Sequence, residues 1–561
     1  MNIIRIILEY KDLFDDKPKN IDYYLNGISK EKLLESAIYY CSLSTLLDPE
    51  LSNLVYPFLL ECDKGTKLEE HIKLKVKEFL NKKNVLPVIL NVRSSLKFFE
   101  LAQNFDCQDN INLSESDIRE RLLKVYLLLN KLHYKGLERK ENFNELLVIQ
   151  SLIHSIYSDT NRHYLRIVEF FKSCLFLKFC ESHIPNHMTK FLHEFGISNW
   201  QEYVLNVHQL GMLIFERSIE NPIIPIIIPI EDENYSKKVF FFDKFCLSDV
   251  YHNDKDFTYI KSKPVVKNEK EGEYYVIFEQ FFIEKMFKGL YFIFNDINKS
   301  FETTEYFIKP AKFRSDFGKK FSEQVLLNKI IKDSIGKKYK HLGYEELQRK
   351  GLPDYYIRDG RNIFLFECKD NLISKEVIDT EDVDIFLKEL HHIFVESEQG
   401  KQKAIKQLIN NIMAIRNGEF IEDIGIKPNN NIIYPIIVTH NTIFSLTGIN
   451  ILVNEWFFKE LDEQAIDKKN IRNITIININ SLILLQGLLS QNEYNLKNII
   501  ESYWGAIDKV SRKKFPTREI VISERYKVSC SFDYFVESKF SGKIKLSKEF
   551  LKYEEYFGKN D

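Results

Sequence analysis

Two apolar, strand-like runs flank the dipeptide Asp359-Gly360, which is a strong hairpin signal. Side chains alternate along a strand, so Glu367 and Lys369 share one face and Cys368 points to the other. The hairpin brings Asp354, just before the first run, alongside the end of the second. The sequence therefore predicts two carboxylates and one ammonium in a small site at the edge of a sheet.

These residue types suit hydrolysis assisted by a divalent cation. Mg²⁺ is commonly held by one or two carboxylates and keeps several waters, which fits Asp354 with Glu367. Lys369 then lies where an ammonium can position an attacking water or offset charge on a phosphodiester oxygen. We expect a Mg²⁺ site here, with Mn²⁺ as a substitute.

The motif resembles that of the PD-(D/E)xK nuclease superfamily, which has the restriction-endonuclease-like fold. That family places Pro-Asp on one strand and Glu-x-Lys on the next, inside an αβββαβ core. Here Pro353-Asp354 is followed, after twelve residues, by Glu367-Cys368-Lys369. The resemblance implies that Asp354 and Glu367 bind the metal, with the backbone carbonyl of Cys368 as a further ligand. It also implies that Lys369 is the catalytic lysine.

Two helical residues extend the resemblance, which covers residues 316–485. Many members carry a glutamate on the helix before the strands, and Glu323 occupies that place. Some carry a glutamine on the helix after them, and Gln407 is the candidate. The resemblance implies catalytic roles for both. A subset adds a tyrosine four residues later, but this chain has Asn411 and departs from that subset.

A plain structural explanation stays open for each of these residues. Asp354 also suits a turn cap, and Glu367 with Lys369 a solvated pair at a strand end. Glu323 and Gln407 also suit the surface of amphipathic helices. What favours the site is the conjunction, because only one of the 14 prolines precedes an aspartate and it does so at this hairpin.

A rival metal site consists of Cys174, Cys180, His183 and His187, whose residue types suit zinc. The first spacing is longer than structural zinc sites typically use, and Pro185 interrupts the histidine pair. Buried helix cysteines with surface histidines are the simpler interpretation.

Charge is concentrated in one segment of a nearly neutral chain. The formal net charge is −2, which excludes bulk attraction to nucleic acid. Residues 309–350, however, contain 12 Lys or Arg against five Asp or Glu. Such a segment favours salt-sensitive phosphate contacts, although a solvated helix face is the alternative. We expect a nucleic-acid partner, DNA rather than RNA.

The periodicity predicts a mixed α/β, multidomain fold in four parts. Residues 1–217 are expected to be mainly helical, 218–310 a small mixed domain, 311–489 the nuclease-like domain and 490–561 an α/β extension. In the third part we expect a helix, a strand pair, a helix, a strand, a helix and a strand. Their predicted ranges are 318–336, 354–370, 381–417, 432–439, 454–466 and 471–479. The first strand of the family core is faint, within 337–348, and the aromatic runs 238–245 and 289–297 favour strands.

Cellular setting follows from composition. The eight cysteines include no Cys-x-x-Cys, which favours reduced thiols in a cytoplasm. The N-terminal residues lack the pattern of a secretory signal, and no apolar stretch reaches about 18 residues, so we expect no membrane contact. Low-GC-like composition and a large non-catalytic half favour prokaryotic restriction or anti-phage defence.

Alternative functions stay open. One is a catalytically silent nucleic-acid-binding or scaffold protein with a nuclease-like fold, and another is an RNase. The chain lacks a P-loop motif, so we expect no built-in motor. Activation by a partner protein or by homo-oligomerisation also stays open.

Overall fold

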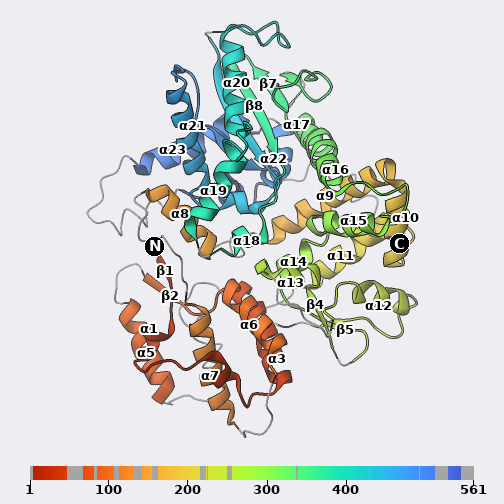
Figure 1. The fold of residues 1–561 in the computed structure, drawn as a ribbon, viewed down its shortest axis with the longest axis vertical. Helices are drawn as coiled ribbons and strands as arrows, with labels where there is room; N and C mark the ends of the chain where they lie inside the picture. Colours follow the sequence, from red (N-terminus) through yellow and green to blue (C-terminus); the bar gives the residue numbers. More distant parts are fainter. Residues whose placement is uncertain are drawn as a thin grey trace. The chain divides into compact units, whose positions relative to one another are not determined.

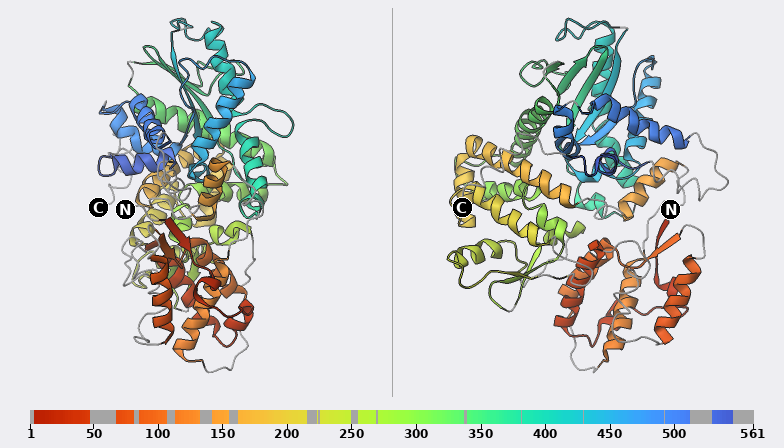
Figure 2. Two further views of the ribbon diagram at one scale, coloured as in Figure 1. Left: turned by 90° about the vertical axis from the view of Figure 1, so that its left-hand side faces the viewer. Right: turned by 180° about the vertical axis from the view of Figure 1, so that it is seen from behind.

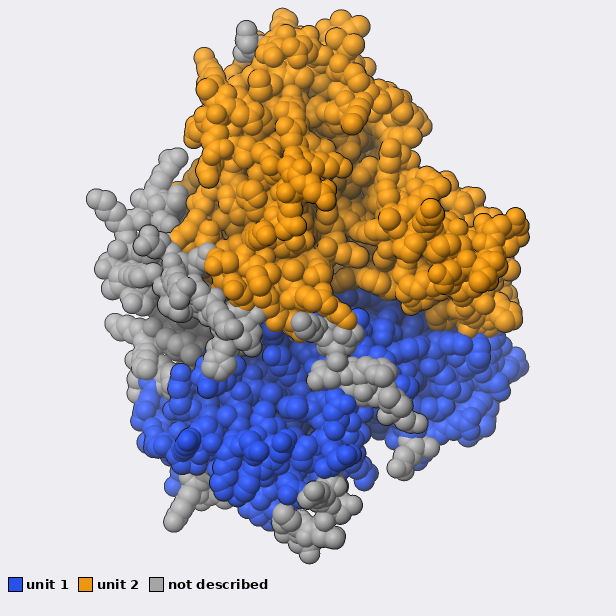
Figure 3. All heavy atoms as spheres, viewed as in Figure 1, with its two compact units in different colours: residues 1–134, 206–285 blue, residues 135–205, 286–561 orange. Residues whose placement is uncertain are grey.

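A computed structural model of the chain separates two compact units, Met1–Tyr134 with Asn206–Lys285 and Lys135–Leu205 with Met286–Asp561 (Figure 3). It is a mixed α/β, multidomain protein, which confirms the predicted fold class. The units divide two of the four predicted ranges, 1–217 and 218–310, and the four ranges stay a prediction. The structure describes residues 4–46, 67–80, 85–106, 113–131, 142–154, 162–214, 223, 225–248, 255–268, 270–336, 339–380, 382–428, 430–491, 493–511 and 529–544.

The first unit combines helices with two small sheets. Strands β1 (Ile4–Ile7) and β2 (Val85–Val88) pair in parallel, an element that the helical periodicity does not predict. Strands β3 (Ile226–Ile227), β5 (Glu273–Val276) and β4 (Val265–Lys267) form an antiparallel sheet in that order. The helices are α1 (Tyr10–Leu13), α2 (Ile21–Leu25), α3 (Lys30–Leu46), α5 (Lys67–Leu80), α6 (Val92–Asn104), α7 (Glu115–Leu129), α12 (Tyr235–Asp243), η2 (Lys255–Phe257), α13 (Thr258–Ser262) and α14 (Glu279–Ile283).

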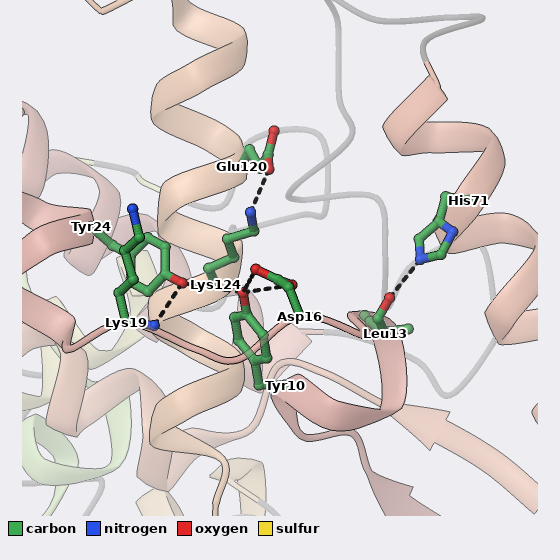
Figure 4. Close-up of polar contacts among 8 residues, drawn as sticks. All are labelled: Tyr10, Leu13, Asp16, Lys19, Tyr24, His71, Glu120 and Lys124. Atoms are coloured by element: carbon green, nitrogen blue, oxygen red, sulfur yellow. Dashed lines mark hydrogen bonds and ion pairs between the residues drawn. The ribbon is translucent and has the colours of Figure 1, made fainter.

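Polar contacts fasten the short helices at the start of this unit (Figure 4). The hydroxyls of Tyr10 and Tyr24 lie 3.1 Å apart, and Tyr10 also donates to Asp16 at 3.2 Å. Burial and the hydrogen bond with Tyr24 raise the pKa of Tyr10, so it stays protonated. Nε2 of His71 lies 2.6 Å from the carbonyl oxygen of Leu13 and joins α5 to α1. The cluster therefore stabilises the local fold.

The second unit is built around a five-stranded sheet in the order β10-β9-β8-β7-β6 (Figures 1 and 2). Adjacent strands are antiparallel from β6 to β8 and parallel from β8 to β10. The strands are β6 (Lys340–Leu342), β7 (Tyr355–Asp359), β8 (Asn362–Lys369), β9 (Ile432–Thr439) and β10 (Thr475–Asn478).

Helices cover this sheet, and α20 packs against both β8 and β9. Figure 1 shows α16 leading toward α17, which packs against α22. No helix in the described ranges combines the length and apolar character needed to cross a bilayer. The helices are α8 (Phe143–His154), α9 (Arg162–His183), α10 (Pro185–Phe195), α15 (Lys288–Ser300), α16 (Pro310–Asp316), η3 (Phe317–Leu327), α17 (Asn328–Ser334), α18 (Lys375–Ile378), α19 (Val383–Phe394), α20 (Ala404–Arg416), η4 (Thr442–Ser445), α21 (Ile449–Glu463), α22 (Ile479–Ser490), α23 (Leu496–Ser511) and α25 (Phe532–Phe540). Helix α11 (Trp200–Ile214) contributes residues to both units.

The predicted element order of the nuclease-like part is confirmed. The hairpin forms between β7 and β8, with Gly360 at a φ of 58° in its turn. Strand β9 spans 432–439 as predicted, β10 is shorter than predicted, and β6 lies within the faint segment. The core therefore has the αβββαβ order.

Two predictions of helix and strand were wrong. The segment 381–417 is two helices, because the chain turns at Gly400, whose φ of 72° favours glycine. The aromatic runs 238–245 and 289–297 lie mainly in α12 and α15 instead of strands. Phe294 of α15 stacks on Phe191 with 5.0 Å between ring centroids. Tertiary packing of this kind outweighs the intrinsic preference of aromatic residues for strands.

The helix before the strands contains an unusual segment, the π-helix η3. The amide of Asn328 bonds to the carbonyl of Glu323, five residues earlier, where an α-helix bonds four residues back. Phe321 packs against Phe176 and Phe179 of α9, with ring centroids 5.1 and 5.6 Å apart. Helix α9 thus supports the segment that carries Glu323.

The loop after α20 is fastened to β7 by one buried carboxylate. Asp423 accepts hydrogen bonds from Arg358 Nε at 2.5 Å and from the Tyr356 hydroxyl at 2.8 Å, and it is 4% exposed. We expect Asp423→Ala to lower the free energy of unfolding by about 3 kcal/mol, because Arg358 loses its partner in a mostly buried site. Urea unfolding measures the change. The neighbouring Glu422→Ala, which removes a more exposed pair with Arg349, should cost less than about 1 kcal/mol. Equal losses would contradict this account.

Candidate active site

Asp354 is fixed to the end of β8 by its main chain and its side chain. Its amide donates to the carbonyl of Phe366 at 2.9 Å, which extends the β7–β8 ladder by one residue. Its Oδ2 accepts the amide of Cys368 at 2.6 Å. The hairpin therefore places this carboxylate beside the Glu-x-Lys segment.

Lys369 connects the strand to α20. Its ammonium donates to Oε1 of Glu367 at 2.6 Å and to Oε1 of Gln407 at 3.0 Å. The side chains of Glu367 and Lys369 are only 3% and 15% exposed. Because neighbours two apart on a strand share a face, β8 presents both groups on one side and α20 supplies Gln407. Glu367 and Lys369 are therefore not the solvent-exposed ion pair that the sequence analysis kept as an alternative.

Glu323 belongs to the same electrostatic cluster. Burial and then the nearby Asp354 carboxylate raise the pKa of Glu323 to about 8, although the charge of Lys369 opposes the shift. Glu323 belongs to η3, whereas Gln407 belongs to α20. Hydrogen bonds thus gather Asp354, Glu367, Lys369 and Gln407 at the carboxyl end of β8, and Glu323 interacts electrostatically with the first three.

Burial and mutual repulsion also shift the pKa values of the strand residues. Burial and then the charge of Asp354 raise the pKa of Glu367 to about 7. Burial raises the pKa of Asp354 as well. Burial opposes the charge of Lys369, but Glu367 and Asp354 outweigh it and raise the pKa of Lys369. One ammonium faces several carboxyl groups, so the cluster has acidic groups in excess of its cations.

The donor set fits a hard divalent cation. Mg²⁺ binds oxygen and is commonly held by one or two carboxylates together with waters. Asp354 and Glu367 supply carboxylates, and Cys368 lies between Glu367 and Lys369 with its carbonyl at the strand end. In the described ranges, no three His, Cys, Asp or Glu side chains are arranged to hold an ion by themselves. Asp354 and Glu367 therefore offer two carboxylates of the kind that such a cation uses.

A clamp behind the site ties η3 and α16 to β8, and we define it as Arg314, Ser322 and Asp370. Arg314 donates to Oδ1 of Asp370 at 3.0 Å and also to its backbone carbonyl. The Ser322 hydroxyl donates to Oδ2 of Asp370 at 2.6 Å. Burial opposes ionisation of Asp370, but the charge of Arg314 and the hydrogen bonds from Arg314 and Ser322 outweigh it and lower its pKa. The clamp joins the residue after Lys369 to the residue before Glu323.

His440 lies on the other side of the strand end, behind Cys368. Its Nε2 is 3.3 Å from Sγ of Cys368. Burial lowers the pKa of His440 to about 4, so the imidazole is neutral. Cys368 is 3% exposed, as the alternation along β8 predicts. This pair packs behind the carboxylates.

Sequence reasoning missed the clamp and His440. Asp370 directly follows the motif, and that adjacency was the one available signal. Arg314 is 56 residues from Asp370 and His440 is 72 from Cys368. Only the fold brings such distant residues together.

Asn411 occupies the position at which a subset of the resembled family has tyrosine. Its side chain forms a hydrogen bond within its own helix. Its side-chain amide donates to the carbonyl of Gln407 at 2.9 Å, and the residue is 2% exposed. Asn411 therefore contacts the backbone of a site residue.

The residues of the rival zinc site are occupied in other ways. Cys174 and Cys180 are buried in α9. His187 lies 3.1 Å from the side-chain oxygen of Asn298, and His183 stacks on Phe179. These contacts are structural, and because His187 is buried, the expectation of a surface histidine was wrong at this position.

Comparisons with known proteins give no further guide to the site. No protein-family model, no curated protein and no solved structure matches the chain.

Proposed function

We propose that the second unit is a Mg²⁺-dependent nuclease that hydrolyses phosphodiester bonds in DNA. The observation that carries the proposal is the convergence of Asp354, Glu367 and Lys369 at the end of β8, with Lys369 held between Glu367 and Gln407. The core order and the Pro-Asp, Glu-x-Lys motif of the PD-(D/E)xK nucleases support it. The raised pKa of Glu323 supports its membership of the site.

The proposal gives each side chain a defined task. Asp354 and Glu367 hold the cation, which when bound supplies charge to offset that of the phosphate and lowers the pKa of water. Gln407 orients the Lys369 ammonium by accepting its hydrogen bond. Lys369 positions the attacking water or donates to the phosphate oxygen as charge develops there. Glu323, with a pKa of about 8, is suited to hold or accept a proton near neutral pH.

The clamp residue Asp370 should position the site without touching substrate. Asp370→Asn removes the charge that Arg314 and Ser322 bind, so η3 and β8 lose part of their connection. We expect kcat for DNA cleavage to fall about tenfold while KM changes little, because orientation is impaired and substrate contacts remain. Steady-state kinetics tests this. The exposed Asp296→Asn, which pairs with Lys299 on α15, is the control. A change confined to KM would contradict a positioning role.

A direct assay tests the function as a whole. Purified full-length protein is incubated with duplex DNA, single-stranded DNA and RNA, with Mg²⁺, Mn²⁺ or EDTA. We expect Mg²⁺-dependent cleavage of DNA that EDTA stops. Cleavage of RNA alone would favour an RNase. Binding without cleavage under every condition would favour a catalytically silent nucleic-acid-binding protein.

The setting of the activity is also a proposal. The buried, unpaired thiols of Cys41, Cys174, Cys180 and Cys368 support a reducing cytoplasm. Restriction or anti-phage defence in a prokaryote stays a prediction from composition. An activating partner protein or a second copy of the chain stays open.

A further inference from the structure

Two lysines on different helices stand in the same relation to the candidate active site. Lys319 lies four residues before Glu323 on η3, and Lys403, at the N-cap of α20, lies four residues before Gln407. Residues four apart on a helix share a face and are about one turn apart. The backbone of each lysine therefore lies about one turn toward the helix N-terminus from that of a site residue, and the amide of Gln407 donates to the carbonyl of Lys403 at 2.8 Å.

Neither lysine takes part in an ion pair within the described ranges. Across the described ranges, neither the Lys319 nor the Lys403 ammonium donates to a carboxylate. Their neighbours on the same helices differ, since Lys320 pairs with Asp316 at 2.9 Å and Lys406 pairs with Glu396. The two helices thus hold these neighbouring lysines in ion pairs, whereas Lys319 and Lys403 form no ion pair within the described ranges.

Both lysines interact electrostatically with residues of the site. The Lys319 ammonium acts to lower the pKa values of Asp354 and Glu323, although burial raises both overall. Burial lowers the pKa of Lys403, and the positive charges of Lys401 and Lys369 lower it further. An anion beside Lys403 would relieve this repulsion. The carboxylates of the site are assigned to the cation, so we look to the substrate for that anion.

We propose that Lys319 and Lys403 bind the sugar-phosphate backbone of the substrate on either side of the bond to be cut. This inference rests on the proposed nuclease function and adds the path of the nucleic acid, past the N-terminal turns of η3 and α20. Contacts of this kind go to phosphates and are independent of sequence. They also release counterions, so affinity should fall with salt.

The salt dependence of binding gives a quantitative test. Each phosphate contact contributes about 0.9 to the slope of log affinity against log salt for duplex DNA. Removing one contact should therefore reduce the loss of affinity between 50 and 200 mM NaCl by about threefold. The double variant should reduce it about tenfold.

The experiment uses full-length protein carrying Lys369→Ala, with Mg²⁺ and a fluorescent DNA duplex, and measures anisotropy from 50 to 200 mM NaCl. Lys319→Gln and Lys403→Gln, singly and together, are compared with Lys320→Gln and Lys406→Gln, which make the same charge change on the same helices. KM and kcat are measured in parallel with Lys369 intact. We expect the first pair to flatten the slope and raise KM, and the second pair to keep the starting slope.

The outcomes separate this inference from the function on which it rests. Equal slopes in all four single variants would overturn the phosphate contacts, whatever the protein cleaves. Flattened slopes without cleavage by the otherwise native protein would overturn the nuclease and leave the contacts standing. Absence of any DNA binding would overturn both.

Discussion

Lys369→Ala is expected to lower the rate of DNA cleavage by about 10³-fold. Loss of a single group that stabilises charge in the transition state typically has an effect of this size. Lys369 is the last residue of β8, and its ammonium contacts Glu367 and Gln407. The substitution removes the hydrogen-bond donor for the charge that develops on the phosphate oxygen. The carboxylates proposed to bind the cation remain in place. Cleavage of a labelled duplex under single-turnover conditions measures the effect.

A control guards against loss of fold. Lys369→Ala also leaves Glu367 without its buried partner, so the thermal midpoint of each protein is measured under the assay conditions. Lys388→Ala removes an exposed lysine from α19, where Lys388 pairs with Glu398 at 3.1 Å, and should cleave as the unchanged protein does. Equal products from a folded Lys369→Ala protein would sink the nuclease mechanism. So would cleavage that survives EDTA.

The second large effect is a loss of stability as pH rises in the absence of divalent cations. Folding raises the pKa values of Glu323 and Glu367 from the usual 4.5 to about 8 and about 7. The folded protein therefore holds protons that the unfolded chain releases. This contribution to stability is fully present below about pH 4.5 and is lost as the pH rises through 7 to 8.

Thermal unfolding between pH 5 and 8.5 in EDTA measures this loss. Relative to a Glu323→Gln, Glu367→Gln double variant, the unchanged protein should lose more than about 1.4 kcal/mol, the value of one pKa unit. Mg²⁺ should raise its midpoint more at pH 8 than at pH 5.5, because the cation competes with the protons. Parallel pH curves for the two proteins would contradict the buried carboxylate cluster. The exposed Glu398→Gln variant controls for a change of charge alone.

The sequence predicted the centre of the site better than its support. Alternation along β8 placed Glu367 with Lys369 and buried Cys368, because a strand has a fixed period of two. Helical spacing carried Glu323 and Gln407 to the right elements. Their roles stay predictions, and their placement beside the strand end was implied by the resemblance to the PD-(D/E)xK nucleases.

What the sequence did not predict depends on contacts between distant segments. The parallel pairing of β1 with β2 joins residues about 80 apart in the sequence. A short apolar run does not indicate which other strand it will pair with. Phe294 occupies a helix because Phe191 packs on it, which no local preference records. Arg314 reaches Asp370 for the same reason.

In the π-helix η3, the number of residues before Glu323 determines where its side chain points. An α-helix turns by about 100° for each residue, so the extra residue accommodated by the π-type bonding sets the angle at which Glu323 leaves the helix. Deleting one residue between Phe317 and Glu323 would allow regular α-helical bonding and swing the carboxylate away from β8 with every side-chain type retained. A homologous chain that keeps the motif but shortens this segment by one residue should therefore not be assumed to share the same active site.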